Sequence, residues 1–134
     1  MLLVHPGGPF YVKKDLGAWT VPKGEIDDGE ELLGAAHREL AEETGFAAPG
    51  PAVALGQVKQ KNGKIVHAWA VRGDADVSQL RSNEFELEWP RKSGRMRSFP
   101  EVDRAEWFEL AEARRRIKPA QIPFLERLAA KLDP

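Results

Sequence analysis

The sequence predicts an α/β protein of the α+β type, in which helices pack against a sheet. Three features carry this prediction: a segment rich in Ala, Leu and Glu at 30–44, two strand-like segments at 53–60 and 64–72, and a helix-like segment at 120–132. Asn62-Gly63 separates the strand-like segments, and this dipeptide is a strong hairpin signal. A chain of 134 residues suffices for one hydrophobic core, so residues 1–134 are expected to form a single domain.

Composition excludes several classes of function. Because 20 basic residues nearly balance 21 acidic ones, the net charge is −1 and no global field attracts nucleic acid or membranes. The absence of cysteine excludes disulfides and thiolate metal sites, and it fits a reducing compartment. No apolar run approaches the roughly 20 residues of a membrane span. We therefore expect a soluble, cytoplasmic protein with a small-molecule substrate and no nucleic-acid or membrane partner; any site for a polyanion must be local.

The first segment, Leu2 to Val4, predicts a strand that ends at Pro6-Gly7-Gly8. Residues 9–23 then predict a loop. Within this loop Trp19 and Val21 alternate as in a short strand, which Pro22 ends.

A helix is predicted over residues 30–44, because the segment contains no proline and Gly45 follows where a left-handed cap would end it. Its apolar stripe is Leu32, Leu33, Ala36 and Leu40. At about 100° per residue, Glu39 and Glu43 fall roughly 20° either side of Leu32. These two carboxylates are therefore expected to face the protein rather than water.

The same helix carries an excess of acidic side chains that repel one another by a few tenths of a kcal/mol per neighbouring pair. Arg38 stands one turn before Glu42 and can hold that carboxylate, but one arginine cannot neutralise all of the acids. One interpretation is an ordinary solvated acidic face. The other is a site for Mg²⁺, or alternatively Mn²⁺, because inward carboxylates need a cation and hard oxygen ligands suit these ions.

The spacing of these residues resembles a known motif. The stretch has Gly24, Glu30, Arg38-Glu39-Leu40, Glu42-Glu43 and Gly45-Phe46 in the order G-x5-E-x7-R-E-U-x-E-E-x-G-U, where U is apolar, and this resembles the complete Nudix box. The preceding W-x-x-P-K-G, from Trp19 to Gly24, is similar to the sequence before the box in family members that cleave polyphosphates. The resemblance implies the Nudix α/β/α sandwich with a central mixed sheet.

The resemblance also implies roles for individual residues. It makes Glu39, Glu43, Glu42 and the Gly24 carbonyl the expected metal ligands, with Glu42, Glu39 and Arg38 as the catalytic group in which Arg38 orients the glutamates. Glu30 either ligates the metal or pairs with Arg38. The general base is not fixed by the motif, and the candidates for it are Glu39, Glu42, Glu86, Glu88 and Glu101.

The later strands contribute further candidates. Both faces of the segment at 64–72 are apolar, which predicts a central strand. Residues 84–89 alternate strictly, with Phe85, Leu87 and Trp89 expected inside. The opposite face carries three glutamates, which are either solvated or include a metal ligand or base at Glu86 or Glu88. Glu101 lies in a P-E-V-D-x-A-x-W-F run that resembles the stretch after the box in many Nudix enzymes, where an acid supplies a further ligand or base.

The segment Pro90 to Ser98 is clearly basic and predicts a flexible loop. Arginine offers paired donors to phosphate oxygens, so Arg95 and Arg97 are candidate substrate contacts. Lys23, just before the box, is a third candidate. For all three the alternative is an ordinary solvated cation.

The C-terminal part predicts a short strand within 104–110 and a helix at 110–117 that ends before Pro119. A second helix is expected at 120–132, with Arg114 to Arg116 on the surface. Its expected core residues are Ile122, Leu125, Leu128, Ala129 and Leu132.

These observations lead to one functional hypothesis: a Mg²⁺-dependent Nudix pyrophosphohydrolase that cleaves a nucleoside diphosphate linked to another moiety. Carboxylate-held divalent ions polarise phosphate and activate water, and basic side chains hold the remaining phosphates. A dinucleoside polyphosphate or a nucleoside triphosphate is the expected substrate. The alternatives are a catalytically silent module of the same fold that binds nucleotides or regulates, and a purely structural acidic helix.

Overall fold

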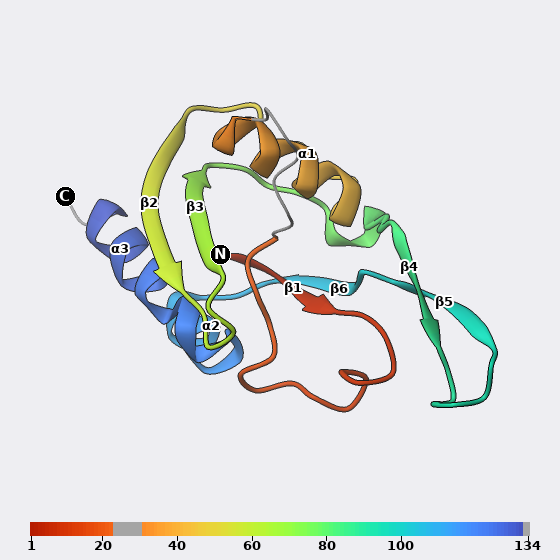
Figure 1. Ribbon diagram of the computed structural model, residues 1–134. Helices are drawn as coiled ribbons and strands as arrows, with labels where there is room; N and C mark the ends of the chain where they lie inside the picture. Colours follow the sequence, from red (N-terminus) through yellow and green to blue (C-terminus); the bar gives the residue numbers. More distant parts are fainter. Residues whose placement is uncertain (23–30, 133–134) are drawn as a thin grey trace.

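The computed structural model describes residues 1–22 and 31–132, which form the strands and helices that Figure 1 shows. The strands are β1 (Leu2–Pro6), β2 (Ala52–Lys59), β3 (Ile65–Val71), β4 (Glu84–Glu88), β5 (Met96–Pro100) and β6 (Val102–Trp107). The helices are α1 (Leu32–Thr44), α2 (Leu110–Arg116) and α3 (Ile122–Leu132), with 3₁₀ turns η1 (Val77–Gln79) and η2 (Pro119–Gln121). The predicted α+β class is confirmed. No helix in this part of the chain is long and apolar enough to cross a membrane.

The strands pair as three antiparallel ladders, β1 with β6, β2 with β3, and β4 with β5. Single bridges tie the loop after β1 to the rest of the fold: Thr20 pairs with Val4 of β1 in antiparallel fashion, and Trp19 pairs in parallel fashion with Ile117, which follows α2. Among the described residues β3 pairs with β2 alone, so the prediction of a central strand is wrong. Val66 and Ala68 on one face of β3 pack into the core, whereas Ile65 on the other face is exposed.

Helix α1 ends as predicted, since Gly45 takes a left-handed φ of 76° and its N–H bonds the Ala41 carbonyl at 2.8 Å. The predicted apolar stripe is only partly right. Leu32 lies in the first turn and is 37% exposed, because the buried face of the helix passes through Ala35, Leu40 and Thr44 instead, and Leu40 packs against the cluster of Val4, Phe46, Val102 and Ala105.

The core consists of that cluster and two others that α2 and α3 cover. Phe124 of α3 packs onto the β2–β3 hairpin, and Leu125 packs against Leu3 and Trp19. The predicted core face of α3 is wrong at Ala129 and Leu132, which are exposed, because the helix packs through its first turns, where Phe124 and Leu125 are buried.

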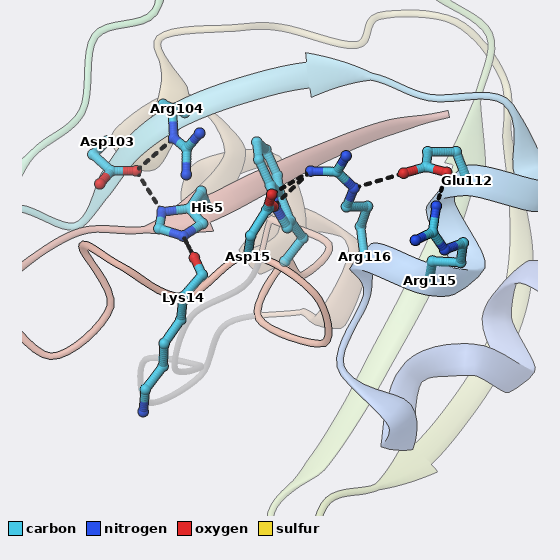
Figure 2. A network of polar contacts seen from close by, with 9 residues as sticks. His5, Lys14, Asp15, Asp103, Arg104, Glu112, Arg115 and Arg116 are labelled. Atoms are coloured by element: carbon cyan, nitrogen blue, oxygen red, sulfur yellow. Dashed lines mark hydrogen bonds and ion pairs between the residues drawn. The ribbon is translucent and has the colours of Figure 1, made fainter.

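A polar network holds the loop after β1 to α2, as Figure 2 shows. The Trp19 indole N–H donates to Asp15 at 2.7 Å, and Asp15 also accepts from Arg116 at 2.6 Å. Arg116 in turn donates through Nε to Glu112 at 2.7 Å. Arg116 is therefore half-buried between two carboxylates, which corrects the prediction that all three arginines of α2 lie on the surface.

This network predicts an acid-sensitive contribution to stability. The hydrogen bond from Trp19, assisted by Arg116 and opposed by partial burial, holds the pKa of Asp15 below its ordinary value of 3.8. A depressed pKa stabilises the fold above the unfolded-state value and stops doing so as the pH falls through the folded-state value. We expect Asp15→Asn to lower the free energy of unfolding by a constant amount between about pH 5 and 7, and this difference to shrink below pH 3.8.

Urea unfolding of the wild type and Asp15→Asn across this range checks the prediction. Asp74→Asn, at an exposed aspartate, controls for the change in net charge. A difference that stayed constant down to the lowest pH would show that Asp15 acts through packing rather than through its charge.

Candidate active site

A cavity of about 190 Å³ brings two of the predicted acids together. Glu43 reaches it from the last turn of α1, and Glu101 reaches it from the connection between β5 and β6. The rest of the lining comes from β1, the loop after it, β6 and the start of η2, and its members are Val4, Pro6, Tyr11, Thr20, Val102 and Lys118. Helix α1 and the β5–β6 connection are far apart in sequence, so tertiary structure alone makes this site.

Backbone hydrogen bonds fix Glu101 relative to helix α1. Carbonyls in the last turn of a helix find no donor within the helix. The Glu42 carbonyl of α1 instead accepts a hydrogen bond from the Asn83 N–H at 2.8 Å. The Asn83 carbonyl accepts from Glu101 N–H at 2.9 Å, and the Glu101 carbonyl accepts from Gly7 N–H at 2.9 Å. Only glycine fits at position 7, because a Cβ there would lie 1.9 Å from the Pro100 carbonyl oxygen.

Arg38 holds the acidic side chains of α1, as predicted. Its Nη1 lies 3.0 Å from Glu42 Oε2 and 2.8 Å from Glu39 Oε1. The Glu39 side chain is only 14% exposed, which agrees with its predicted inward position, whereas that of Glu42 is 44% exposed. The guanidinium thus offsets the repulsion between two carboxylates and orients both.

Lys118 is a cation in the cavity that the sequence analysis did not find. It is half-buried, and this burial lowers its pKa from the ordinary value of 10.5. Its Nζ also lies 5.9 Å from the centre of the Tyr11 ring. In the sequence Lys118 is a single lysine before a proline. No local pattern around it indicates that it lies in the same cavity as Glu43 of helix α1.

A buried histidine anchors the loop that carries Tyr11 (Figure 2). His5 Nε2 donates to the Lys14 carbonyl at 2.6 Å, because a carbonyl can only accept, and Nδ1 lies 2.7 Å from Asp103 Oδ1. The loop is therefore fixed between β1 and β6, with Tyr11 at the cavity. His5 shows no metal-ligand spacing with the other histidines in the sequence, and in the structure its side chain holds this loop in place.

A protein-family model, the NUDIX domain, matches residues 1–128. The chain belongs to this family. The predicted resemblance is confirmed, and the match extends well beyond the box to the strands and helices around it.

Individual relatives agree with this assignment. An RNA pyrophosphohydrolase of Novosphingobium aromaticivorans is 53% identical over 53 residues, which cover 36% of this NUDIX domain and 33% of the relative. An RNA pyrophosphohydrolase of Rhizobium meliloti is 29% identical over 124 residues, covering 81% of this chain and 66% of the relative. The chain thus matches less than two thirds of either protein. The crystal structure of a C. elegans Ap4A hydrolase binary complex has a TM-score of 0.68 at 23% identity, covering 98% of this chain and 85% of that one.

The donor set of the NUDIX domain suits a divalent cation in part. Glu43 and Glu101 offer carboxylate oxygens, which hard cations such as Mg²⁺ prefer. Within residues 1–22 and 31–132, no group of three or more acidic or histidine side chains is close enough to hold an ion. The predicted ligand Gly24, the predicted acid Glu30 and the predicted phosphate contact Lys23 all lie outside the described residues.

The remaining predicted residues lie on the β4–β5 hairpin, away from the cavity lining. Glu86 and Glu88 are exposed on β4, and Glu88 accepts a hydrogen bond from the Lys92 N–H at 2.7 Å. Arg95 and Arg97 are exposed at the outer end of the hairpin. The prediction of a loop is wrong at residues 96–98, which belong to β5, because they pair with β4 in register.

Proposed function

We propose that this NUDIX domain hydrolyses a phosphoanhydride bond in a substrate that links a nucleoside diphosphate to another group, and that the reaction requires a divalent cation, Mg²⁺ or alternatively Mn²⁺. The observation that carries the proposal is the meeting of Glu43, Glu101 and Lys118 in one cavity. Two carboxylates beside a lysine match a cation bound to a phosphate chain. The family membership of residues 1–128 supports it.

The residues divide into three roles. Glu43 and Glu39, with Gly24 and Glu42, would hold the cation, which when bound polarises phosphate and acidifies water. Arg38 positions Glu39 and Glu42 through its ion pairs. Lys118 binds the phosphate group that accumulates negative charge during cleavage. Among the candidate bases, Glu101 is favoured over Glu86 and Glu88, because it lines the cavity and they do not.

The substrate class follows from the same chemistry and from the relatives. Dinucleoside polyphosphates and nucleoside triphosphates both present a phosphoanhydride between nucleoside and leaving group. The names of the relatives, RNA pyrophosphohydrolase and Ap4A hydrolase, support nucleotides with several phosphates and add the 5′ end of RNA to the candidates.

The test is the release of phosphate or nucleotide from a panel of dinucleoside polyphosphates, nucleoside triphosphates, 5′-triphosphorylated RNA and nucleotide sugars. We expect turnover of at least one nucleotide with Mg²⁺ or Mn²⁺, and none in EDTA. Ligand binding without turnover, in the presence of Mg²⁺, would instead identify a silent binding module. Equal turnover with and without EDTA would overturn the metal dependence.

A further inference from the structure

The β4–β5 hairpin has two chemically different faces. Residues directly opposite in an antiparallel pair share a face, and successive residues alternate. Phe85 opposite Phe99 and Leu87 opposite Arg97 therefore form one face, which is aromatic and cationic. The other face carries the three glutamates of β4, Glu84, Glu86 and Glu88, opposite Pro100, Ser98 and Met96.

The aromatic face continues onto the loop after β1. Phe10 packs edge-on against Trp89, with ring centres 5.5 Å apart, and the Arg91 guanidinium lies 5.0 Å from the centre of the Phe10 ring. Phe10 remains 41% exposed, so part of the ring is open to a ligand. We call Phe10, Trp89 and Arg91 the aromatic platform. The next residue in the chain, Tyr11, lines the carboxylate cavity, so the platform adjoins the proposed active site.

Positive charge surrounds this platform. The hairpin end carries four exposed cations within residues 91–97, namely Arg91, Lys92, Arg95 and Arg97. Among the described residues, no carboxylate lies within ion-pair distance of any of these four side chains. The exposed Phe10 ring and the half-buried Trp89 ring, beside arginines without a carboxylate partner, match the requirements of a single-stranded polynucleotide, whose bases stack and whose phosphates need cations.

We propose that the aromatic platform binds the nucleotides that follow the 5′ phosphates of a single-stranded RNA. The 5′ polyphosphate would enter the cavity beside Tyr11, the first bases stack on Phe10 and Trp89, and the backbone phosphates contact the hairpin arginines. This inference rests on the proposed function and selects RNA within its substrate class. It also departs from the expectation, drawn from the net charge, that nucleic acid is not a partner, because here the charge is local.

The test compares turnover of substrates that differ in length alone. The catalytic efficiency kcat/KM is measured with Mg²⁺ for a nucleoside triphosphate and for 5′-triphosphorylated oligoribonucleotides of two, four and eight nucleotides with the same first base. Stacking on an aromatic side chain changes binding on the order of 10-fold per base. We therefore expect kcat/KM to rise by about 10-fold or more from the mononucleotide to the longer RNAs, and this gain to fall as salt is added.

Single variants assign the gain to the platform. Phe10→Ala and Arg91→Gln are each expected to reduce the ratio of kcat/KM between the eight-nucleotide RNA and the nucleoside triphosphate by about 10-fold. Because the ratio is internal to each variant, a general loss of folded protein does not alter it. Arg72→Gln, at an exposed arginine after β3, is the matched control and should leave the ratio unchanged.

The outcomes are distinguishable. Turnover of the nucleoside triphosphate with no gain from length would overturn this inference and leave the proposed function intact. If no substrate is turned over, the proposed function fails, and binding of 5′-phosphorylated RNA, measured by fluorescence anisotropy, decides the inference: equal affinity of the wild type and Arg91→Gln would overturn it. An equal gain with 5′-triphosphorylated DNA would overturn the choice of RNA.

Discussion

Glu43→Gln is expected to lower kcat/KM by 10²- to 10³-fold on the preferred nucleotide while the fold is retained. Glutamine keeps the size of the side chain but removes the negative charge that Glu43 brings to the cavity beside Glu101 and Lys118. Removing one preorganised electrostatic contact from an enzyme typically costs a factor of about 10²–10³. A carboxylate that also holds the catalytic cation should lie at the upper end of that range.

Two measurements check this expectation. Steady-state kinetics with Mg²⁺ gives the loss of activity, and the thermal midpoint with and without Mg²⁺ reports on cation binding independently of turnover. We expect Mg²⁺ to raise the midpoint of the wild type and to raise that of Glu43→Gln much less. Glu106→Gln, the same substitution at an exposed position of β6, should behave like the wild type in both measurements.

A loss of less than about 10-fold for Glu43→Gln would contradict the assignment. In that case Glu43 would not hold the cation during the reaction. A full loss of activity together with an unchanged Mg²⁺ shift would instead give Glu43 a role in proton transfer and leave cation binding to the other acids.

The local features of the fold and the site were predictable from sequence. The periodicity of α1 placed Glu39 inward, and the structure leaves only 14% of its side chain exposed. The cap at Gly45 and the Asn62-Gly63 hairpin also follow from the backbone preferences of a few adjacent residues. The box pattern correctly predicted the family, because its spacing is itself local.

The contacts between distant segments were not predictable in this way. Lys118 reaches the cavity because its N–H bonds the Trp19 carbonyl at 2.8 Å, a contact across almost the whole chain. The β5 strand looked like a flexible basic loop, since its strand character depends on pairing with β4 and not on its own sequence. The aromatic platform likewise exists only because Phe10 meets Trp89.

Trp19→Ala is expected to lower the free energy of unfolding by about 3–5 kcal/mol, the largest effect of any single truncation proposed here. Trp19 is fully buried in the cluster of Leu3, Ala113, Ile117 and Leu125. Since domains are typically stable by only 5–15 kcal/mol, such a loss would remove a large share of the total.

The Trp19 ring also has specific partners. It packs edge-on against His5 and Phe108, with ring centres 5.2 and 5.1 Å away, and its indole N–H donates to Asp15. Trp19→Phe separates these contributions, because it retains most of the ring but loses the donor. We expect Trp19→Phe to cost about 1–3 kcal/mol, clearly less than Trp19→Ala. Equal losses in the two variants, measured by urea unfolding, would mean that the hydrogen bond to Asp15 rather than packing dominates.

Truncation of Trp19 should also affect the cavity. The backbone of Trp19 accepts from Lys118 and donates to the Arg116 carbonyl at 2.9 Å, so its position determines where Lys118 enters the site. At a temperature where Trp19→Phe is still folded, we therefore expect its KM for the nucleotide to rise more than its kcat falls, because Lys118 binds phosphate while the carboxylates of Glu43 and Glu101 stay in place. A fall in kcat with an unchanged KM would show instead that Trp19 supports the carboxylates, and that the core beneath the cavity positions its acids rather than its lysine.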